Sequence, residues 1–125
     1  MKFTFPKKER LKRQKLIEQL FSEGLSVTVL PLKLVYIKAD LPEKVPVQAG
    51  FSASKKSFRH SVYRNRIKRL MRETYRLNKA IIFNNSKTQY AFMFLYLGKE
   101  LPDFHTLHTA MKTILERFKG KELLK

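Results

Sequence analysis

Apolar residues near the beginning of the chain follow the spacing of a single helix face. They recur at i, i+1, i+4 and i+5, at positions Leu16, Ile17, Leu20 and Phe21. This stripe predicts an amphipathic helix from about Lys12, and Gly24 is expected to end it. Residues 1–11, before the helix, predict a basic extended arm whose aromatic residues, Phe3 and Phe5, could pack on the domain or stack on nucleic-acid bases.

Three segments predict β-strands. Val27–Lys38 is apolar and β-branched but contains Pro31, which removes a donor from the hydrogen-bond ladder, so this strand is expected to start late or to lie at an edge there. Val45–Ala53 alternates between apolar and polar positions, which predicts a half-buried strand antiparallel to the first. Gln89–Gly98 is apolar at nearly every position, as a central strand covered on both faces would be.

Two further helices complete the pattern, one from about Ser61 and one from about Phe104. The first of these is expected to bury a face formed by Tyr63, Ile67, Leu70, Thr74, Leu77 and Ile81. It also connects Val45–Ala53 to Gln89–Gly98 as a crossover, which makes these two strands parallel neighbours. The predicted order is α-β-β-α-β-α with a possible extra short strand, an α+β fold in which residues 1–125 form a single domain.

The distribution of charge adds a binding surface to this scaffold. The 27 Lys and Arg residues outnumber the 10 Asp and Glu residues, giving a formal net charge of +17, and 17 of the 27 fall within residues 1–16 and 55–79. The helix from about Ser61 carries a row of cations at i, i+4 spacing, formed by Arg64, Lys68, Arg72 and Arg76. Beside or bordering this row lie Asn65, Arg66, Arg69 and Lys79.

Such a row is unfavourable for a protein alone in water, because three successive like-charged pairs cost about 1 kcal/mol in total. A solvated helix face usually mixes charges of both signs, whereas the only acid here is Glu73, which could pair with Arg69 or Arg76. A polyanion would turn the repulsion into attraction by placing phosphates along the row and releasing counterions. The row therefore favours nucleic-acid binding over a solvated face.

The sequence lacks the residue clusters that an enzyme doing its own hydrolysis would need. It has no cysteine, its carboxylates are scattered, and its four glycines stand singly, so no thiolate site, two-metal site or phosphate loop is expected. His105 and His108 are predicted to be surface residues, and His60 could contact a phosphate or merely occupy a turn. No apolar run approaches the roughly 20 residues of a membrane helix, and no targeting segment is evident. We expect a cytoplasmic binding protein without catalytic residues, metal ligands or cofactors of its own.

Two motifs resemble the signature of the bacterial ribonuclease P protein family. The sequence F-S-A-S-K-K at 51–56 precedes S-V-Y-R-N-R-I-K-R-L-M-R-E at 61–73. R-L-K at Arg10–Lys12 and F-S-E-G at Phe21–Gly24 also match, so the resemblance covers nearly the whole chain. It implies the α+β sandwich of the ribonuclease P protein, also known as the ribosomal protein S5 domain 2-like fold.

The resemblance implies a role for each matching residue. In the family, the arginine-rich helix lies against the catalytic RNA, which implies RNA binding by Lys55, Lys56, Arg64, Asn65, Arg66, Lys68, Arg69 and Arg72, with Arg76 in the same row. A cleft between the first helix and the sheet binds the 5′ leader of precursor tRNA in the family, which implies leader contacts by Ile17, Phe21 and Tyr36. The RNA binds Mg²⁺ and does the chemistry, so the implied function is assistance in the endonucleolytic removal of the leader during tRNA 5′ maturation.

Two other functions would use the same cationic helix. A ribosomal or other structural RNA-binding protein would bind RNA without stimulating cleavage of precursor tRNA. A DNA-binding regulator would need a dimer-forming segment or a helix-turn-helix pair, and neither is evident in the sequence, so no DNA partner is expected.

Overall fold

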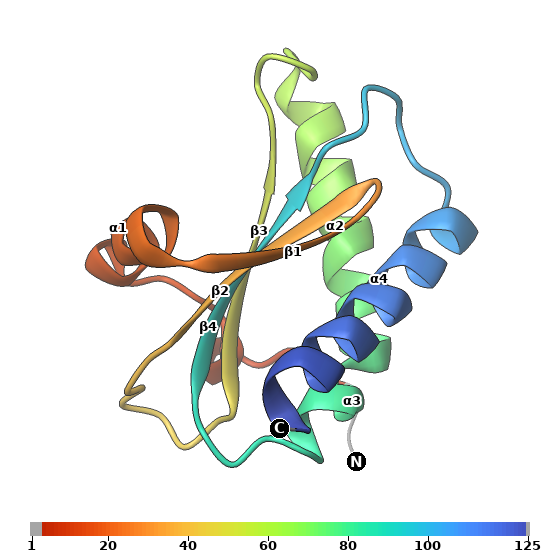
Figure 1. Cartoon of the computed structure of the whole chain (residues 1–125). Helices are drawn as coiled ribbons and strands as arrows, with labels where there is room; N and C mark the ends of the chain where they lie inside the picture. Colours follow the sequence, from red (N-terminus) through yellow and green to blue (C-terminus); the bar gives the residue numbers. More distant parts are fainter. Residues whose placement is uncertain (1–3, 125) are drawn as a thin grey trace.

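Helices cover both faces of a four-stranded sheet in the computed structural model, which describes residues 4–124. In Figure 1, α1 (Gln14–Glu23) lies on one face, and α2 (Ser61–Asn78) and α4 (Phe104–Phe118) lie together on the other. The strands are β1 (Leu25–Val29), β2 (Leu32–Lys38), β3 (Val47–Ala53) and β4 (Tyr90–Tyr96). Three short elements complete the chain: the 3-10 turn η1 (Lys7–Glu9), α3 (Ala80–Phe83) and the π-helical turn η2 (Lys119–Leu123). The predicted α+β order is confirmed, including the extra strand.

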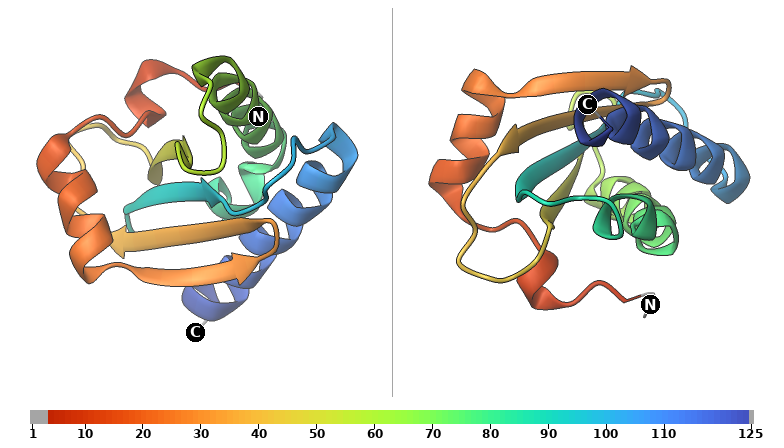
Figure 2. Two further views of the ribbon diagram at one scale, coloured as in Figure 1. Left: turned by 90° about the horizontal axis from the view of Figure 1, so that it is seen from above. Right: turned by 60° about the horizontal axis from the view of Figure 1, so that its bottom comes forward.

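The sheet has the strand order β1-β2-β4-β3 and contains both kinds of pairing (Figure 2). β1 and β2 form an antiparallel hairpin in which Val29 pairs with Leu32, so the single strand predicted over Val27–Lys38 is in fact two strands. Pro31 lies in the turn between them, where its missing N–H interrupts no ladder. β3 pairs with β4 in parallel, as predicted, but β4 separates it from β2, so β3 is not a neighbour of the first strand.

The two faces of the sheet bury clusters of different chemistry. Facing α2 and α4, the cluster is rich in aromatic rings, among them Phe92, Phe94 and Phe118, which are fully buried. Facing α1, the cluster is smaller and almost entirely aliphatic, with Leu20 and Val35 among its members. Within residues 4–124, no helix combines the length and the apolar character needed to cross a lipid bilayer.

α2 buries a face that is rotated from the predicted one. Ile67 and Thr74 are buried as expected, but Met71 and Tyr75 are buried with them, whereas Tyr63 is 43% exposed. α2 packs against α4 as well as against β3, so its buried face is turned toward the space between these two elements. The prediction of Tyr63 as a core residue is therefore wrong, and the ring is available at the surface.

The chain before α1 wraps around the outer edge of β3. The ring of Phe5 meets the rings of Phe51 and Tyr75 edge-on, at centroid distances of 5.7 and 5.9 Å. The backbone N–H of Leu11 donates to the carbonyl of Ala49 on β3 at 3.0 Å. Phe5 therefore packs on the domain, which was one of the two alternatives for the arm; the other aromatic of the arm, Phe3, lies outside the described residues.

A buried ion pair holds this N-terminal segment against the end of α2. Lys79 Nζ donates to Glu9 Oε1 at 2.6 Å, and both side chains are almost completely buried. The arm predicted as extended contains the 3-10 turn η1, and that turn places Glu9 toward Lys79. The basic residues on either side of Glu9 are thus attached to the same body as the cationic helix.

Candidate nucleic-acid interface

Four cations lie close together in the middle of α2. Arg66, Arg69 and Arg72 are exposed and Lys68 is half-buried. Within residues 4–124, the side chains of these four residues make no hydrogen bond or ion pair. Asn65, which is also exposed, adds an amide that can donate and accept hydrogen bonds. Because the opposite face of α2 is fixed in the aromatic cluster, the guanidinium groups are presented from a rigid base.

Arg64, the first member of the predicted row, has a different position. Its Nη1 donates to the carbonyl oxygens of Phe58 and Arg59, at 2.7 and 2.9 Å. These bonds fold the Arg64 side chain back onto the loop before α2 and fix the path of that loop. Arg64 therefore acts as a brace for the loop as well as a source of positive charge.

Arg76, the last member of the row, is paired with the single acid of the helix. Both Nε and Nη2 of Arg76 donate to the Glu73 carboxylate, with a distance of 3.2 Å for the Nε bond. Hydrogen bonding from Arg76 lowers the pKa of Glu73, and the same bonding raises the pKa of Arg76. The predicted salt bridge of Glu73 is confirmed with Arg76, the second of its two possible partners.

Lys55 and Lys56 lie in the turn that follows β3. Both side chains are exposed, and the turn is closed by bonds from the Phe58 N–H to the Ser54 carbonyl at 2.9 Å and from the Lys56 N–H to Ser54 Oγ at 3.1 Å. The turn leads directly into α2, so the two ammonium groups extend the cationic surface beyond the beginning of the helix.

The flank of α1 that carries Ile17 and Phe21 borders an uncovered part of the sheet. Ile17 is half-buried against the aliphatic cluster, and Phe21, one turn later on the same side, is 56% exposed. On the same sheet face, strand pairing aligns Leu95 with Lys33 on one side and Ser52 on the other, and all three are only half-buried. This row across three strands was not predicted, although the alternation along each strand is the signal that could have found it.

The structure corrects the expected position of Tyr36. Its side chain is 1% exposed and lies on the opposite face of the sheet from α1, with its ring 4.7 Å from that of Phe118. Its hydroxyl donates to Glu122 Oε2 at 2.6 Å, and burial together with this bond raises its pKa. Because successive residues of a strand point to opposite faces, Val35 faces α1 and Tyr36 cannot share a cleft with Ile17 and Phe21.

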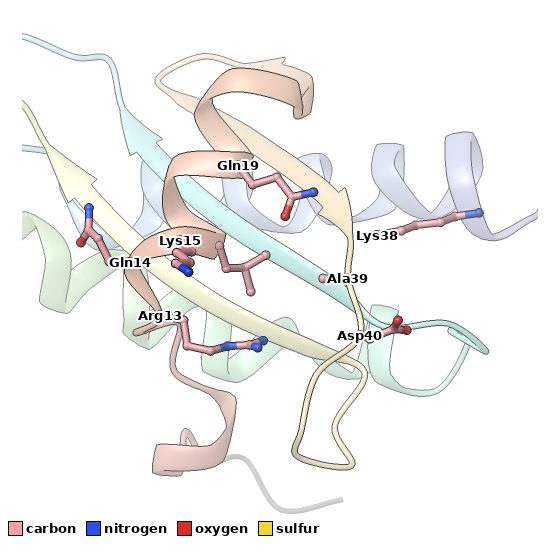
Figure 3. A pocket seen from close by; sticks show the side chains of 8 residues that line it. Arg13, Gln14, Lys15, Gln19, Lys38, Ala39 and Asp40 are labelled. Atoms are coloured by element: carbon pink, nitrogen blue, oxygen red, sulfur yellow. The ribbon is translucent and has the colours of Figure 1, made fainter.

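A groove of about 670 Å³ runs along the other flank of α1. Arg13, Lys15 and Gln19 line it from the side of the helix, and Lys38–Asp40 line it from the end of β2. Figure 3 shows Arg13 extending from the start of α1, while Lys38 and Asp40 point away from the helix. From the sequence, Arg13 and Lys15 were recognisable only as members of the basic segment 1–16. Nothing in the sequence pattern indicated that Lys38 would lie beside them.

The histidines do not assemble a metal centre. Within the described part of the chain, no group of three or more His, Asp or Glu side chains is arranged to hold a metal ion. His108 stacks on the exposed ring of Phe104 at 5.3 Å, and His60 meets Tyr63 edge-on at 6.0 Å. The rings of His60 and His108 therefore take part in aromatic contacts, and His105 is exposed, as predicted for a surface residue.

The chain is similar to proteins of one known family. The family model described as Ribonuclease P matches residues 5–119. The ribonuclease P protein components of Porphyromonas gingivalis and Chlorobium phaeobacteroides are 37% and 36% identical to the chain. Each alignment covers 94% of this chain. It covers 88% of the Porphyromonas gingivalis protein and 89% of the Chlorobium phaeobacteroides protein.

Solved structures share the fold at lower identity. The RNase P protein of Staphylococcus aureus matches with a TM-score of 0.70 at 19% identity, over 94% of this chain and 98% of that one. The RNase P protein of Thermotoga maritima matches with a TM-score of 0.69 at 22% identity, over 87% and 96%. From the family match and the two relatives, which extend over almost its whole length, we conclude that this chain belongs to the ribonuclease P protein family.

Proposed function

We propose that the chain binds the catalytic RNA of ribonuclease P through α2 and assists that RNA in removing the 5′ leader of precursor tRNA in the cytoplasm. The observation that carries the proposal is the group of cations in the middle of α2, which have no hydrogen-bond or ion-pair partner within residues 4–124: the exposed Arg66, Arg69 and Arg72 and the half-buried Lys68. Guanidinium groups meet phosphates in a bidentate manner and also stack on bases, so folded RNA is the partner that suits this surface best.

The contacts with the catalytic RNA are assigned to two groups of residues. Lys55, Lys56, Asn65, Arg66, Lys68, Arg69 and Arg72 would contact the RNA directly, since their side chains are at the surface. Arg64 and Arg76 would contribute charge while keeping their bonds to the loop carbonyls and to Glu73. Residues 1–125 would thus act as a single RNA-binding domain, with the basic N-terminal segment fixed beside α2 through Glu9 and Lys79.

The leader of precursor tRNA would cross the sheet beside α1. Phe21 offers an exposed ring on which an unpaired base can stack, and Ile17, Leu95 and Ser52 provide a flatter surface next to it. Lys33 lies in the same row and could meet a phosphate of the leader. Mg²⁺ would be held by the RNA. The cations of the protein would neutralise part of the phosphate repulsion between the precursor and the catalytic RNA, so a lower Mg²⁺ concentration would bring the two RNAs together.

Cleavage of precursor tRNA by the cognate catalytic RNA, with and without the protein, tests this function. We expect the protein to lower the Mg²⁺ concentration needed for cleavage, and the triple variant Arg66→Ala, Arg69→Ala, Arg72→Ala to lose most of this effect. Its RNA affinity should also depend less on salt, by roughly one unit of slope for each phosphate contact removed. A variant with Lys87, Lys112 and Arg117 changed to Ala removes three cations outside α2, one from the loop before β4 and two from α4, and is the control.

The same assay separates this function from its nearest alternative. RNA binding without stimulated cleavage would point to a structural RNA-binding protein. Equal behaviour of the triple variant and its control would show that α2 is not the RNA-binding surface.

A further inference from the structure

The loops that follow β3 and β4 line an open, shallow pocket beside the first turn of α2. It has a volume of about 420 Å³ and is lined by residues 57–60 and 99–101 together with Tyr63. This is within the range of sites that bind small organic groups. None of the roles proposed above for α2 or for the face beside α1 uses it.

Both walls of the pocket are fixed by hydrogen bonds and ring contacts. Arg64 braces one wall through the carbonyls of Phe58 and Arg59. The hydroxyl of Tyr96 braces the other wall by donating to the Glu100 carbonyl at 2.6 Å, and its ring lies 6.0 Å from that of Phe58. The two loops are therefore held by the same tyrosine, and a ligand would meet a preformed site.

The rim of the pocket exposes apolar surface that the fold does not use. Tyr63 is 43% exposed, Leu101 is 40% exposed, and the His60 ring lies edge-on to Tyr63. Val62 and Leu97, in the adjoining parts of the same two segments, are exposed as well. Large apolar side chains gathered at one end of a highly charged protein indicate a contact surface.

Charge determines what kind of partner suits this surface. Arg59 and Lys99 are exposed on opposite walls of the pocket, and Glu100 is the single acid in its lining. An anion is therefore favoured at the rim, and a flat apolar group is favoured against the Tyr63 and His60 rings. One molecule that combines both is a nucleotide, whose base can stack and whose phosphate can pair with Arg or Lys.

We propose that this pocket holds a single unpaired nucleotide of the RNA that binds α2. The base stacks on the ring of Tyr63 and meets the ring of His60 edge-on, and its phosphate lies between Arg59 and Lys99. The inference rests on the proposed function, and it extends the α2 surface because Tyr63 stands one residue before the basic row. A paired base could not occupy the pocket, since its faces are covered by its neighbours in the duplex.

Binding of a transcript of the catalytic RNA to Tyr63→Ala, Tyr63→Phe and Phe104→Ala tests the pocket. Removing the ring should weaken binding roughly 5- to 150-fold, the effect of losing one stacked base, with the salt dependence unchanged. Tyr63→Phe keeps the ring and should bind as the original protein does. Phe104→Ala removes an equally exposed ring outside the pocket lining and should have no effect.

Arg59→Ala should behave differently from Tyr63→Ala, because it removes a phosphate contact and should lower the salt slope by about one.

A second measurement locates the contact directly, by following backbone amide resonances of the full chain during titration with single-stranded hexaadenylate. Shifts in residues 57–63 and 99–101, absent with duplex RNA, are expected.

Two results would overturn the proposal that the pocket holds a nucleotide. One is unchanged RNA affinity of Tyr63→Ala; the other is an equal loss with Phe104→Ala. Either result would leave the α2 interface intact as long as the triple arginine variant still loses affinity. If that variant also binds normally, the proposed function itself fails, so the two failures can be told apart.

Discussion

The two faces of the sheet differ in the side chains they bury and in how far helices cover them. Under α2 and α4, aromatic rings pack edge to face around Phe118, which lies 4.7 to 5.0 Å from the rings of Tyr36, Tyr90 and Phe92. Under α1, the smaller cluster is aliphatic, and Phe21 remains outside it. The first face is closed and its cations stand on a fixed helix, whereas the second is partly open.

This difference matches the two kinds of RNA contact proposed above. A folded RNA has its phosphates at fixed positions, so the cations that meet them gain from being held in place. A single-stranded segment adapts its own shape, and a few accessible rings and polar groups are sufficient to hold it. On this proposal, the aromatic cluster contributes to RNA binding because it fixes the direction of α2.

The largest expected effect comes from removing the ring at the centre of the aromatic cluster. Phe118→Ala leaves a cavity among three aromatic partners and should lower the free energy of unfolding by about 3–5 kcal/mol. Leu16→Ala, at the margin of the aliphatic cluster, should cost about 2 kcal/mol, at the low end for such changes. Urea denaturation with an unchanged m-value measures both. Equal losses would show that the faces do not differ in packing.

A somewhat smaller effect on stability is expected from breaking the buried ion pair that attaches the N-terminal segment to the end of α2. Lys79→Met leaves Glu9 buried without its partner and should destabilise the fold by about 3 kcal/mol. The double variant Glu9→Leu, Lys79→Met replaces the pair with apolar groups and should recover most of the loss. Thermal unfolding of the single and double variants decides this, and a double variant no more stable than Lys79→Met would contradict it.

The sequence predicted the elements more reliably than the faces they bury. Helical spacing located α1 and α4, and the nearly continuous apolar run located β4 as the central strand. Periodicity alone assigned Tyr63 to the core, because it does not show that α2 has two packing partners. Likewise, the resemblance named Tyr36 for the cleft, but alternation along β2 turns Val35 toward α1 instead.

The sequence identified which residues form the candidate site. It did not show which of their side chains are free and which are bonded to other groups, because that depends on tertiary contacts. The basic row was recognisable from its i, i+4 spacing, and Glu73 from its place within reach of Arg76. The bonds from Arg64 to the loop carbonyls were not predictable, since they require the loop to turn back over the helix. The pocket beside Tyr63 depends on two loops from distant parts of the chain and has no signal in the sequence.

The smallest effect on stability, and the most specific one on binding, is expected for Phe21→Ala. Because the ring is mostly exposed, the free energy of unfolding should change by no more than about 0.5 kcal/mol. Binding of precursor tRNA to the assembled ribonucleoprotein should weaken by about 1–3 kcal/mol, while binding of mature tRNA, which has no leader to stack, should stay the same. Phe104→Ala, with a ring of similar exposure on the other side of the sheet, is the matched control. A loss that is equal for precursor and mature tRNA would mean that the open face beside α1 does not hold the leader, and the contrast between the two faces would then concern packing alone.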